Sequence, residues 1–281
     1  MRALLSHADV DRLLVEHGLA PRRDLGQNFV GDPNTVRRIA RLADVGPGSS
    51  VVEIGAGLGS LTLALAETGA DVTAVEVDRG IVPVLRSVVV DEPNVRIVEA
   101  DAMRVDWAAL LAGSTRWTLV ANLPYNVATP LVCDLLDGVP SITRMLVMVQ
   151  REVAERLCAA PRSEAYGAVS VKVAYWATAR VAGLVPAAVF RPRPNVESAL
   201  AEITRRDSPA VDIDPAPLFH LVRSAFGHRR KMLRRSLSGV VAPETFVRAG
   251  IDAQRRPEEL GVTEWGQLTQ AWLEQDGAGG D

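Results

Sequence analysis

The 281-residue chain has little of several features that usually set the class of a protein. It has only two cysteines, and nothing near them has the spacing of metal ligands, so no metal site is expected. Two isolated thiols indicate a reduced, cytoplasmic protein rather than a disulfide-bonded secreted one. No apolar run approaches the ~20 residues of a membrane span. Residues 1–18 mix acids and two histidines with leucines, which predicts an amphipathic helix and not a signal peptide.

The chain also lacks a strong excess of charge of either sign. Its formal net charge is −3, which alone argues mildly against a nucleic-acid partner. The basic residues are nevertheless unevenly distributed, because residues 223–237 contain six Lys or Arg and no acid. Such a segment is typical of a surface that binds an anionic partner, although a solvated basic helix has the same composition.

The first part of the chain alternates between short apolar runs and helical patterns. The predicted strands are residues 50–55, 71–78, 95–101, 117–122 and 144–150. They are almost wholly apolar, as in a parallel sheet that is covered on both faces, and the stretches between them are long enough for helices. The pattern therefore predicts an α/β fold with a doubly wound sheet.

The pattern changes after residue 165. Residues 170–185 and 197–206 are predicted as long strands with no helix between them, which indicates an antiparallel pair that ends the sheet. From residue 207 a proline-rich stretch leads into a region with only helical signals. We therefore expect two domains, residues 1–206 with the sheet and residues 207–281 with a small helical domain.

Three consecutive predicted strands end in residues that could bind a nucleoside. The first runs into a glycine loop that includes Gly55 and Gly57, where the backbone can approach a ligand closely. Glu76 ends the next strand, where an acid can bind ribose hydroxyls, and Asp101 ends the third. No Lys or Arg near the loop could pair with phosphates, so S-adenosylmethionine fits better than NAD. A tight turn with two solvated acids is the alternative.

The fourth strand ends in Asn122-Leu123-Pro124-Tyr125, which carries no charge. An exocyclic base amine is a poor nucleophile, and it needs acceptors that hold its hydrogens. The side-chain oxygen of Asn122 and the carbonyl beside Pro124 could accept them, since proline has no competing N–H and restricts Leu123 to extended conformations. Tyr125 could stack on the base. The alternative is a proline turn that closes the strand.

These motifs together resemble the small-subunit (16S) ribosomal RNA adenine dimethyltransferases, the KsgA/RsmA family, from about residue 22 to 273. The segments that carry the resemblance are LGQNFV (25–30), EIGAGLGSLT (53–62), EVD (76–78), DAM (101–103), NLPYNVATPL (122–131), YGAVSV (166–171), FRPRPNVESA (190–199) and AFGHRRKMLRRSL (225–237). The resemblance implies a Rossmann-like, class I S-adenosylmethionine-dependent methyltransferase sheet with a small C-terminal all-helical domain.

The resemblance also implies roles for individual residues. The donor, S-adenosylmethionine, would contact Asn28, Val30, Gly55, Gly57, Glu76, Asp101 and Asn122. The catalytic segment would be Asn122, Leu123, Pro124 and Tyr125. Phe190 would stack on the face of the target base opposite Tyr125. From the residues alone, Phe190 fits the apolar core equally well.

The substrate implied by the resemblance is a pair of adjacent adenosines in the 3′-terminal hairpin loop of small-subunit ribosomal RNA. The chain would act as a cytoplasmic monomer on an immature 30S subunit. Candidate phosphate contacts are Arg223, Arg229, Arg230, Lys231, Arg234 and Arg235. If this segment is one helix, these side chains cannot all face the same way, so about half would contact RNA.

Four positions depart from the usual family pattern, namely Val30, Ala56, Ala168 and Glu197. Ala168 stands where an arginine is common, which puts any contact made there in doubt, and none of the four lies in the Asn122 segment. Two other functions stay open. One is an NAD-dependent oxidoreductase, and the other is a ribosome-assembly factor that binds RNA without catalysis.

Overall fold

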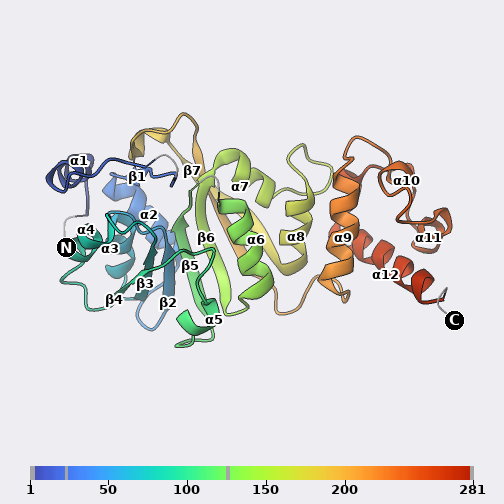
Figure 1. The fold of residues 1–281 in the computed structure, drawn as a ribbon, viewed down its shortest axis with the longest axis horizontal. Helices are drawn as coiled ribbons and strands as arrows, with labels where there is room; N and C mark the ends of the chain where they lie inside the picture. The colour runs from blue at the N-terminus through green and yellow to red at the C-terminus, as the bar shows by residue number, and fades with distance from the viewer. Residues whose placement is uncertain (1–3, 23–24, 125–126, 279–281) are drawn as a thin grey trace. The chain divides into compact units, whose positions relative to one another are not determined.

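Residues 4–22, 25–124 and 127–278 are described by a computed structural model. The chain forms two compact units, and Figure 1 shows their elements coloured along the sequence. The sheet unit comprises Met1–Ala154 and Arg180–Arg205, and the helical unit comprises Glu155–Ala179 and Arg206–Asp281. Each unit has an apolar core of its own.

The described part of the sheet unit contains a seven-stranded sheet with the order β4-β3-β2-β5-β6-β9-β7. The strands are β2 (Ser50–Ile54), β3 (Asp71–Glu76), β4 (Val95–Glu99), β5 (Trp117–Asn122), β6 (Ile142–Gln150), β7 (Ala177–Val185) and β9 (Ser198–Arg205). Strands β2 to β6 pair in parallel, and β9 pairs with β6 antiparallel. All five strands predicted from the apolar runs are present, so the predicted α/β sheet is confirmed.

Helices connect the parallel strands, as expected for crossovers. They are α3 (Ser60–Ala66), α4 (Val82–Val88), α5 (Trp107–Leu110) and α6 (Ala128–Gly138), and α2 (Pro33–Ala43) precedes the sheet. The start of α2 follows the sequence signal, because the Asp32 carboxylate accepts the Thr35 N–H at 2.9 Å and Pro33 occupies the first helical position. After β6 the chain enters α7 (Arg151–Leu157).

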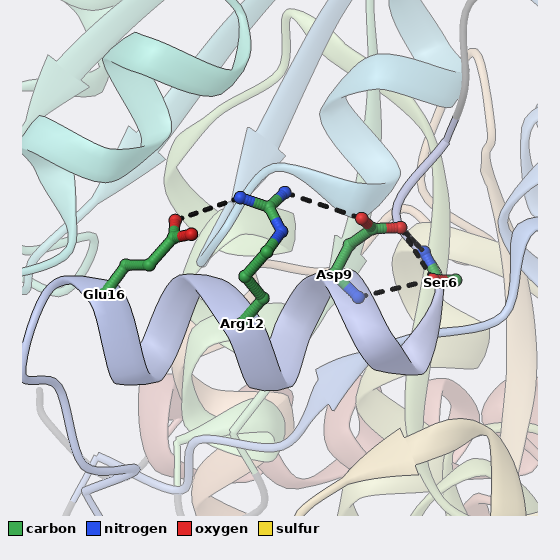
Figure 2. Close-up of polar contacts among 4 residues, drawn as sticks. All are labelled: Ser6, Asp9, Arg12 and Glu16. Carbon is green, nitrogen blue, oxygen red and sulfur yellow. Dashed lines mark hydrogen bonds and ion pairs between the residues drawn. The ribbon is translucent and has the colours of Figure 1, made fainter.

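The N-terminal helix α1 (His7–Glu16) is amphipathic, as predicted. It buries Val10, Leu13 and Leu14 and exposes a polar row, which Figure 2 shows. Ser6 and Asp9 form a capping box, in which the Ser6 hydroxyl accepts the Asp9 N–H and the Asp9 carboxylate accepts the Ser6 N–H. Arg12 then pairs with Asp9 and Glu16 along the exposed face of the helix (Figure 2).

A short two-stranded ladder brings distant segments of the sheet unit together. Strand β1 (Phe29–Val30) pairs antiparallel with β8 (Phe190–Arg191), which follows the 3-10 turn η1 (Ala187–Val189). In this register Val30 lies opposite Phe190. The segment that precedes the sheet is thereby fixed next to the proline-rich loop of the predicted antiparallel region.

The helical unit is built around a core that includes Trp265 and Tyr166, both almost fully buried. Its elements are α8 (Ala168–Trp176), α9 (Pro215–Phe226), α10 (Leu233–Ser236), α11 (Pro243–Arg248), η2 (Pro257–Glu259) and α12 (Val262–Ala278). Residues 155–179 cluster with this unit, whereas the sequence placed the domain boundary at residue 206. Helix α8 packs on α9, a long-range contact that no local pattern reveals.

The prediction of one strand over residues 170–185 is wrong in its first half. Residues 168–176 form α8, and the strand begins only at Ala177. The Ser170 hydroxyl accepts the Gly167 N–H at 3.0 Å and donates to the Arg156 carbonyl at 2.6 Å, which fixes the start of the helix. Tyr175 packs in the core of the helical unit, so tertiary burial outweighs the β-propensity of the valines.

The basic residues of the segment 223–237 do not lie on one helix. Helix α9 ends at Phe226, and α10 begins only at Leu233. Gly227 ends α9, and the backbone N–H groups of Leu233 and Arg234 then bond to the carbonyls of Arg255 and Ala253 at 2.8 and 3.0 Å. These bonds hold the start of α10 against another turn, so the six basic residues lie on two helices and the turn between them.

The described residues contain no helix that combines the length and the hydropathy needed to cross a membrane. Cys133 is buried and Cys158 is half-buried. Among the same residues, no group of three or more His, Cys, Asp or Glu is arranged to hold a metal ion.

Candidate active site

The carboxyl ends of β3, β2 and β5 meet at one edge of the sheet, because these strands are parallel neighbours. Glu76, the glycine loop and Asn122 therefore lie side by side around one cavity. Its far wall is formed by residues 25–30, here called the wall segment. The structure thus brings together Asn28, Val30, Gly55, Gly57, Glu76 and Asn122, as the sequence predicted.

Two glycines of the loop adopt conformations that other residues rarely take. Gly55 has φ +74° and Gly57 has φ +56°. A Cβ at Gly57 would lie 3.1 Å from the ring of Phe29, so the wall segment packs directly on the loop backbone. The glycine at residue 57 therefore serves both the turn and the close approach of the wall segment.

Glu76 is a buried carboxylate that organises the loop. Its Oε2 accepts the Gly57 N–H at 2.7 Å, and its Oε1 accepts the N–H groups of Val77 and Asp78, both at 2.9 Å. Burial raises the pKa of Glu76, and these three backbone hydrogen bonds oppose the rise. A carboxylate has about four lone-pair sites, so Oε2 can still accept one hydroxyl of a bound ribose.

The sequence analysis missed Glu53, which also lines this cavity. It lies in β2 with 1% of its surface exposed, and burial together with the nearby charge of Glu76 raises its pKa to about 8. The Thr62 side chain beside it lowers this pKa in part, whereas the Glu53 Oε2 and the Ser60 hydroxyl are buried without a hydrogen-bond partner among the described atoms. A glutamate inside an otherwise apolar strand was the signal that could have revealed it.

Asp101 lies beside a second, mainly apolar cavity. Its neighbours there include Ile54, Val75, Val77 and Leu131. Asp101 Oδ1 accepts the Met103 N–H at 2.9 Å, which orients the carboxylate. A carboxylate between apolar side chains suits a flat aromatic ring that carries an amino group, as the sequence analysis expected for adenine.

The wall segment contacts the predicted catalytic segment through its backbone. Asn122 Nδ2 donates to the Asn28 carbonyl at 2.9 Å, while the Asn28 side chain donates to the Gly26 carbonyl at 3.0 Å. Asn28 thus touches Asn122 with its main chain and not with its side chain. Val30, buried in β1, likewise belongs to the cavity wall.

The rest of the predicted catalytic segment is described in part. Leu123 is buried, and its N–H donates to the Met148 carbonyl at 3.0 Å. The Pro124 carbonyl accepts the N–H of Ala128 at 3.1 Å, which leads the chain into α6. Tyr125 lies outside the described residues. Phe190 is 1% exposed and packs in the core of the sheet unit, so its role against a base stays a prediction.

The predicted RNA contacts lie in the helical unit and differ among themselves. Arg229 is half-buried, and its guanidinium bonds to the Glu258 carboxylate at 2.6 Å and to the Glu164 carbonyl at 2.7 Å. The others are exposed, namely Arg223, Arg230, Lys231, Arg234 and Arg235. Arg229 therefore has a structural partner that the sequence did not reveal.

Residues 18–273 match the family model of the ribosomal RNA adenine dimethylases. The chain belongs to the ribosomal RNA adenine dimethylase family. It is 46% identical over 277 residues to a ribosomal RNA small subunit methyltransferase A of Thermobifida fusca, which covers 95% of this chain and 96% of the relative. A protein of the same name from Streptomyces coelicolor is 45% identical over 279 residues, with the same coverage.

Solved structures show the same fold. A dimethyladenosine transferase from Plasmodium falciparum superposes with a TM-score of 0.76 at 19% identity, covering 88% of this chain and 98% of that one. The 23S rRNA methyltransferase ErmE superposes with a TM-score of 0.64 at 24% identity, covering 88% and 100%. The predicted class I methyltransferase fold is confirmed.

Family membership makes the chain an S-adenosylmethionine-dependent methyltransferase that dimethylates adenines of ribosomal RNA. Both the oxidoreductase and the non-catalytic assembly factor are thereby set aside. The site fits the donor, because the unpartnered Glu53 oxygen and Ser60 hydroxyl line the cavity beside Glu76. An ammonium and the ribose hydroxyls would give these polar atoms partners.

Proposed function

We propose that the chain transfers methyl groups to the exocyclic amines of two adjacent adenosines in the 3′-terminal hairpin loop of small-subunit ribosomal RNA. It acts on an immature 30S subunit, in the cytoplasm and as a monomer. The observation that carries the proposal is the carboxamide of Asn122, whose Nδ2 is bound to the Asn28 carbonyl at 2.9 Å. Its Oδ1 is thus the atom that can accept a hydrogen from a target amine.

S-adenosylmethionine supplies an activated methyl group when bound, and Asn28, Val30, Gly55, Gly57, Glu76 and Asp101 would hold it together with Asn122. Glu76 would accept a ribose hydroxyl through Oε2. Asp101 would accept a hydrogen from the adenine amino group. These residues bind and orient the donor, and none of them needs to move a proton.

Asn122 and the carbonyl beside Pro124 act on the target base. They accept the two hydrogens of the amine, which favours a tetrahedral nitrogen whose lone pair is no longer delocalised into the ring. Methyl transfer forms an N–C bond as the S–C bond of the donor breaks, and the proton that the nitrogen then loses passes to water. Positioning supplies most of the rate, so an uncharged site is sufficient.

Tyr125 and Phe190 are proposed to hold the flipped base between their rings. Unstacked loop bases suit an enzyme that must take a base into a pocket. The exposed arginines and Lys231 of the helical unit contact backbone phosphates, which give affinity without sequence information. Arg229 contributes less, since its guanidinium is already paired with Glu258.

The proposal is tested by methyl transfer from labelled S-adenosylmethionine onto small subunits that lack these methyl groups, with the products mapped by mass. We expect two methyl groups on each of two adjacent adenosines near the 3′ end of the RNA. Methylation elsewhere in the RNA, or only on naked RNA, would refute the proposed substrate while leaving the family assignment unchanged.

A further inference from the structure

The wall segment is fastened to two strand ends through neighbouring residues. Gln27 Nε2 donates to Asp78 Oδ2 at 2.8 Å, just beyond the end of β3. The carbonyl of Asn28 accepts Asn122 Nδ2 at the end of β5. Because β2 lies between β3 and β5, the two contacts stand on opposite sides of the glycine loop. The wall segment therefore bridges the loop with one anchor at each side.

The contact between Gln27 and Asp78 has only one favourable arrangement. Gln27 Oε1 accepts the backbone N–H of Arg22 at 2.8 Å, which leaves Nε2 to face Asp78. Asp78 Oδ1 accepts the N–H of Gly80 at 2.9 Å, so Oδ2 is the oxygen that receives Gln27. Rotating the Gln27 carboxamide would place two oxygens together and would leave the Arg22 N–H without its acceptor.

The other anchor determines which way Asn122 faces. A carbonyl oxygen can only accept, so the NH₂ group of Asn122 must point to Asn28. The oxygen of Asn122 is then the end of the carboxamide that is left for another partner. Its orientation depends on where the Asn28 carbonyl lies, and Asn28 directly follows Gln27.

We propose that Gln27 and Asp78 are positioning residues for methyl transfer, because their hydrogen bond holds the Asn28 carbonyl where it fixes Asn122 with its oxygen toward the target amine. The inference rests on the proposed function, which makes that oxygen the acceptor for the amine. Neither residue touches the reacting atoms. Their effect is through geometry, and a misplacement of about 1 Å can lower a rate by about 100-fold.

A reciprocal exchange tests this contact. Gln27→Glu places a carboxylate against Asp78, and Asp78→Asn places an NH₂ group against the NH₂ of Gln27, so either change removes the hydrogen bond. The double variant restores it with donor and acceptor reversed, and the bonds to Arg22 and Gly80 are kept. We expect single-turnover rates at saturating donor and RNA to fall about 10- to 100-fold in each single variant. The double variant should recover to within about threefold of the wild-type rate.

Two further measurements separate positioning from a loss of folding or of donor binding. Calorimetry gives the donor dissociation constant of each variant, and ¹⁵N NMR of labelled asparagine reports the Nδ2 hydrogens of Asn122 in the donor-free protein. The Asn122 signal should shift in both single variants and return in the double variant. Gln270→Ala is the matched control, because Gln270 Nε2 donates to a carboxylate, Glu274 Oε1, at 2.7 Å on α12, and Gln270 is not among the residues that line the cavity. It should keep the wild-type rate.

Single variants that keep the wild-type rate would overturn the proposal and leave the proposed function intact. The proposal also fails if the single variants lose only donor affinity, or if the double variant stays as slow as the single ones. A wild-type protein that methylates no small-subunit RNA would refute the proposed function and this inference together. The wild-type reaction therefore distinguishes the two failures.

Discussion

The buried carboxyl group of Glu53 makes the stability of the donor-free protein depend on pH. Its pKa rises from an ordinary 4.5 to about 8, because 1% exposure leaves the charged form almost unsolvated. Between these values the unfolded chain ionises Glu53 while the folded protein keeps it protonated. The folded state then binds more protons, so the free energy of unfolding decreases as the pH rises and levels off above about pH 8.

Glu53→Gln should remove this decrease, since the amide has the shape of the protonated acid and does not ionise. One pKa unit corresponds to about 1.4 kcal/mol, so the full shift corresponds to about 5 kcal/mol. The free energy of unfolding of the variant minus that of the wild type should therefore be larger at pH 9 than at pH 4.5, by up to that amount. At pH 4.5 and below, the two proteins should differ by a nearly constant amount.

Urea unfolding of the donor-free proteins at pH 4.5, 7 and 9, followed by tryptophan fluorescence, measures this difference. Glu152→Gln, which changes an exposed glutamate of α7, is the control and should give the same small difference at each pH. A difference between Glu53→Gln and wild type that stays constant from pH 4.5 to 9 would refute the reasoning about the buried carboxyl group.

Three further predictions concern the donor-binding carboxylate, the glycine loop and the basic residues of the helical unit. Glu76→Ala should raise the donor dissociation constant, measured by calorimetry, by about 10- to 100-fold, because charged hydrogen bonds of about 1.5–3 kcal/mol are lost. Unchanged affinity would place the donor elsewhere. Gly57→Ala should weaken donor binding and lower the free energy of unfolding by about 1–2 kcal/mol or more, which is the cost of a non-glycine residue in the left-handed conformation. Gly48→Ala is the control, because an added Cβ there would meet no atom within 4 Å, and it should lower the free energy of unfolding without changing donor binding. In RNA-binding titrations, Arg230→Gln should reduce the slope of log affinity against log salt by about 0.7–0.9. Arg229→Gln should reduce this slope less, because Arg229 is paired with Glu258. Equal changes in the two variants would contradict the role of that ion pair.

The strands of the sheet could be predicted because burial on both faces leaves a direct trace in the sequence. Val51, Val52 and Ile54 of β2 form an apolar run, and so do Leu119 and Val120 of β5. The location of the residues at the strand ends could be predicted as well. A glycine loop, an acid and an uncharged Asn-Leu-Pro segment follow successive strands, and parallel strands bring these ends to one edge.

The helical unit was less predictable because its structure depends on distant contacts. Residues 168–176 resemble a strand in composition, yet packing of Tyr175 and capping by Ser170 make them a helix. The basic segment looked continuous, but Gly227 and the backbone bonds of Leu233 divide it. Arg229 and Glu258 are 29 positions apart in the sequence, so no local pattern could indicate that they form an ion pair.

The most direct test of the account is the single-turnover rate of Asn122→Ala on under-methylated small subunits, measured beside its affinity for those subunits. Loss of one positioned polar group typically lowers a rate by about 100- to 1,000-fold. RNA affinity comes mainly from phosphate contacts, so the dissociation constant for the subunit should change less than about threefold. The account predicts that the rate falls by at least about 100-fold while binding is kept. A variant that methylates at nearly the wild-type rate would contradict it, and Asn122 would then only end a strand.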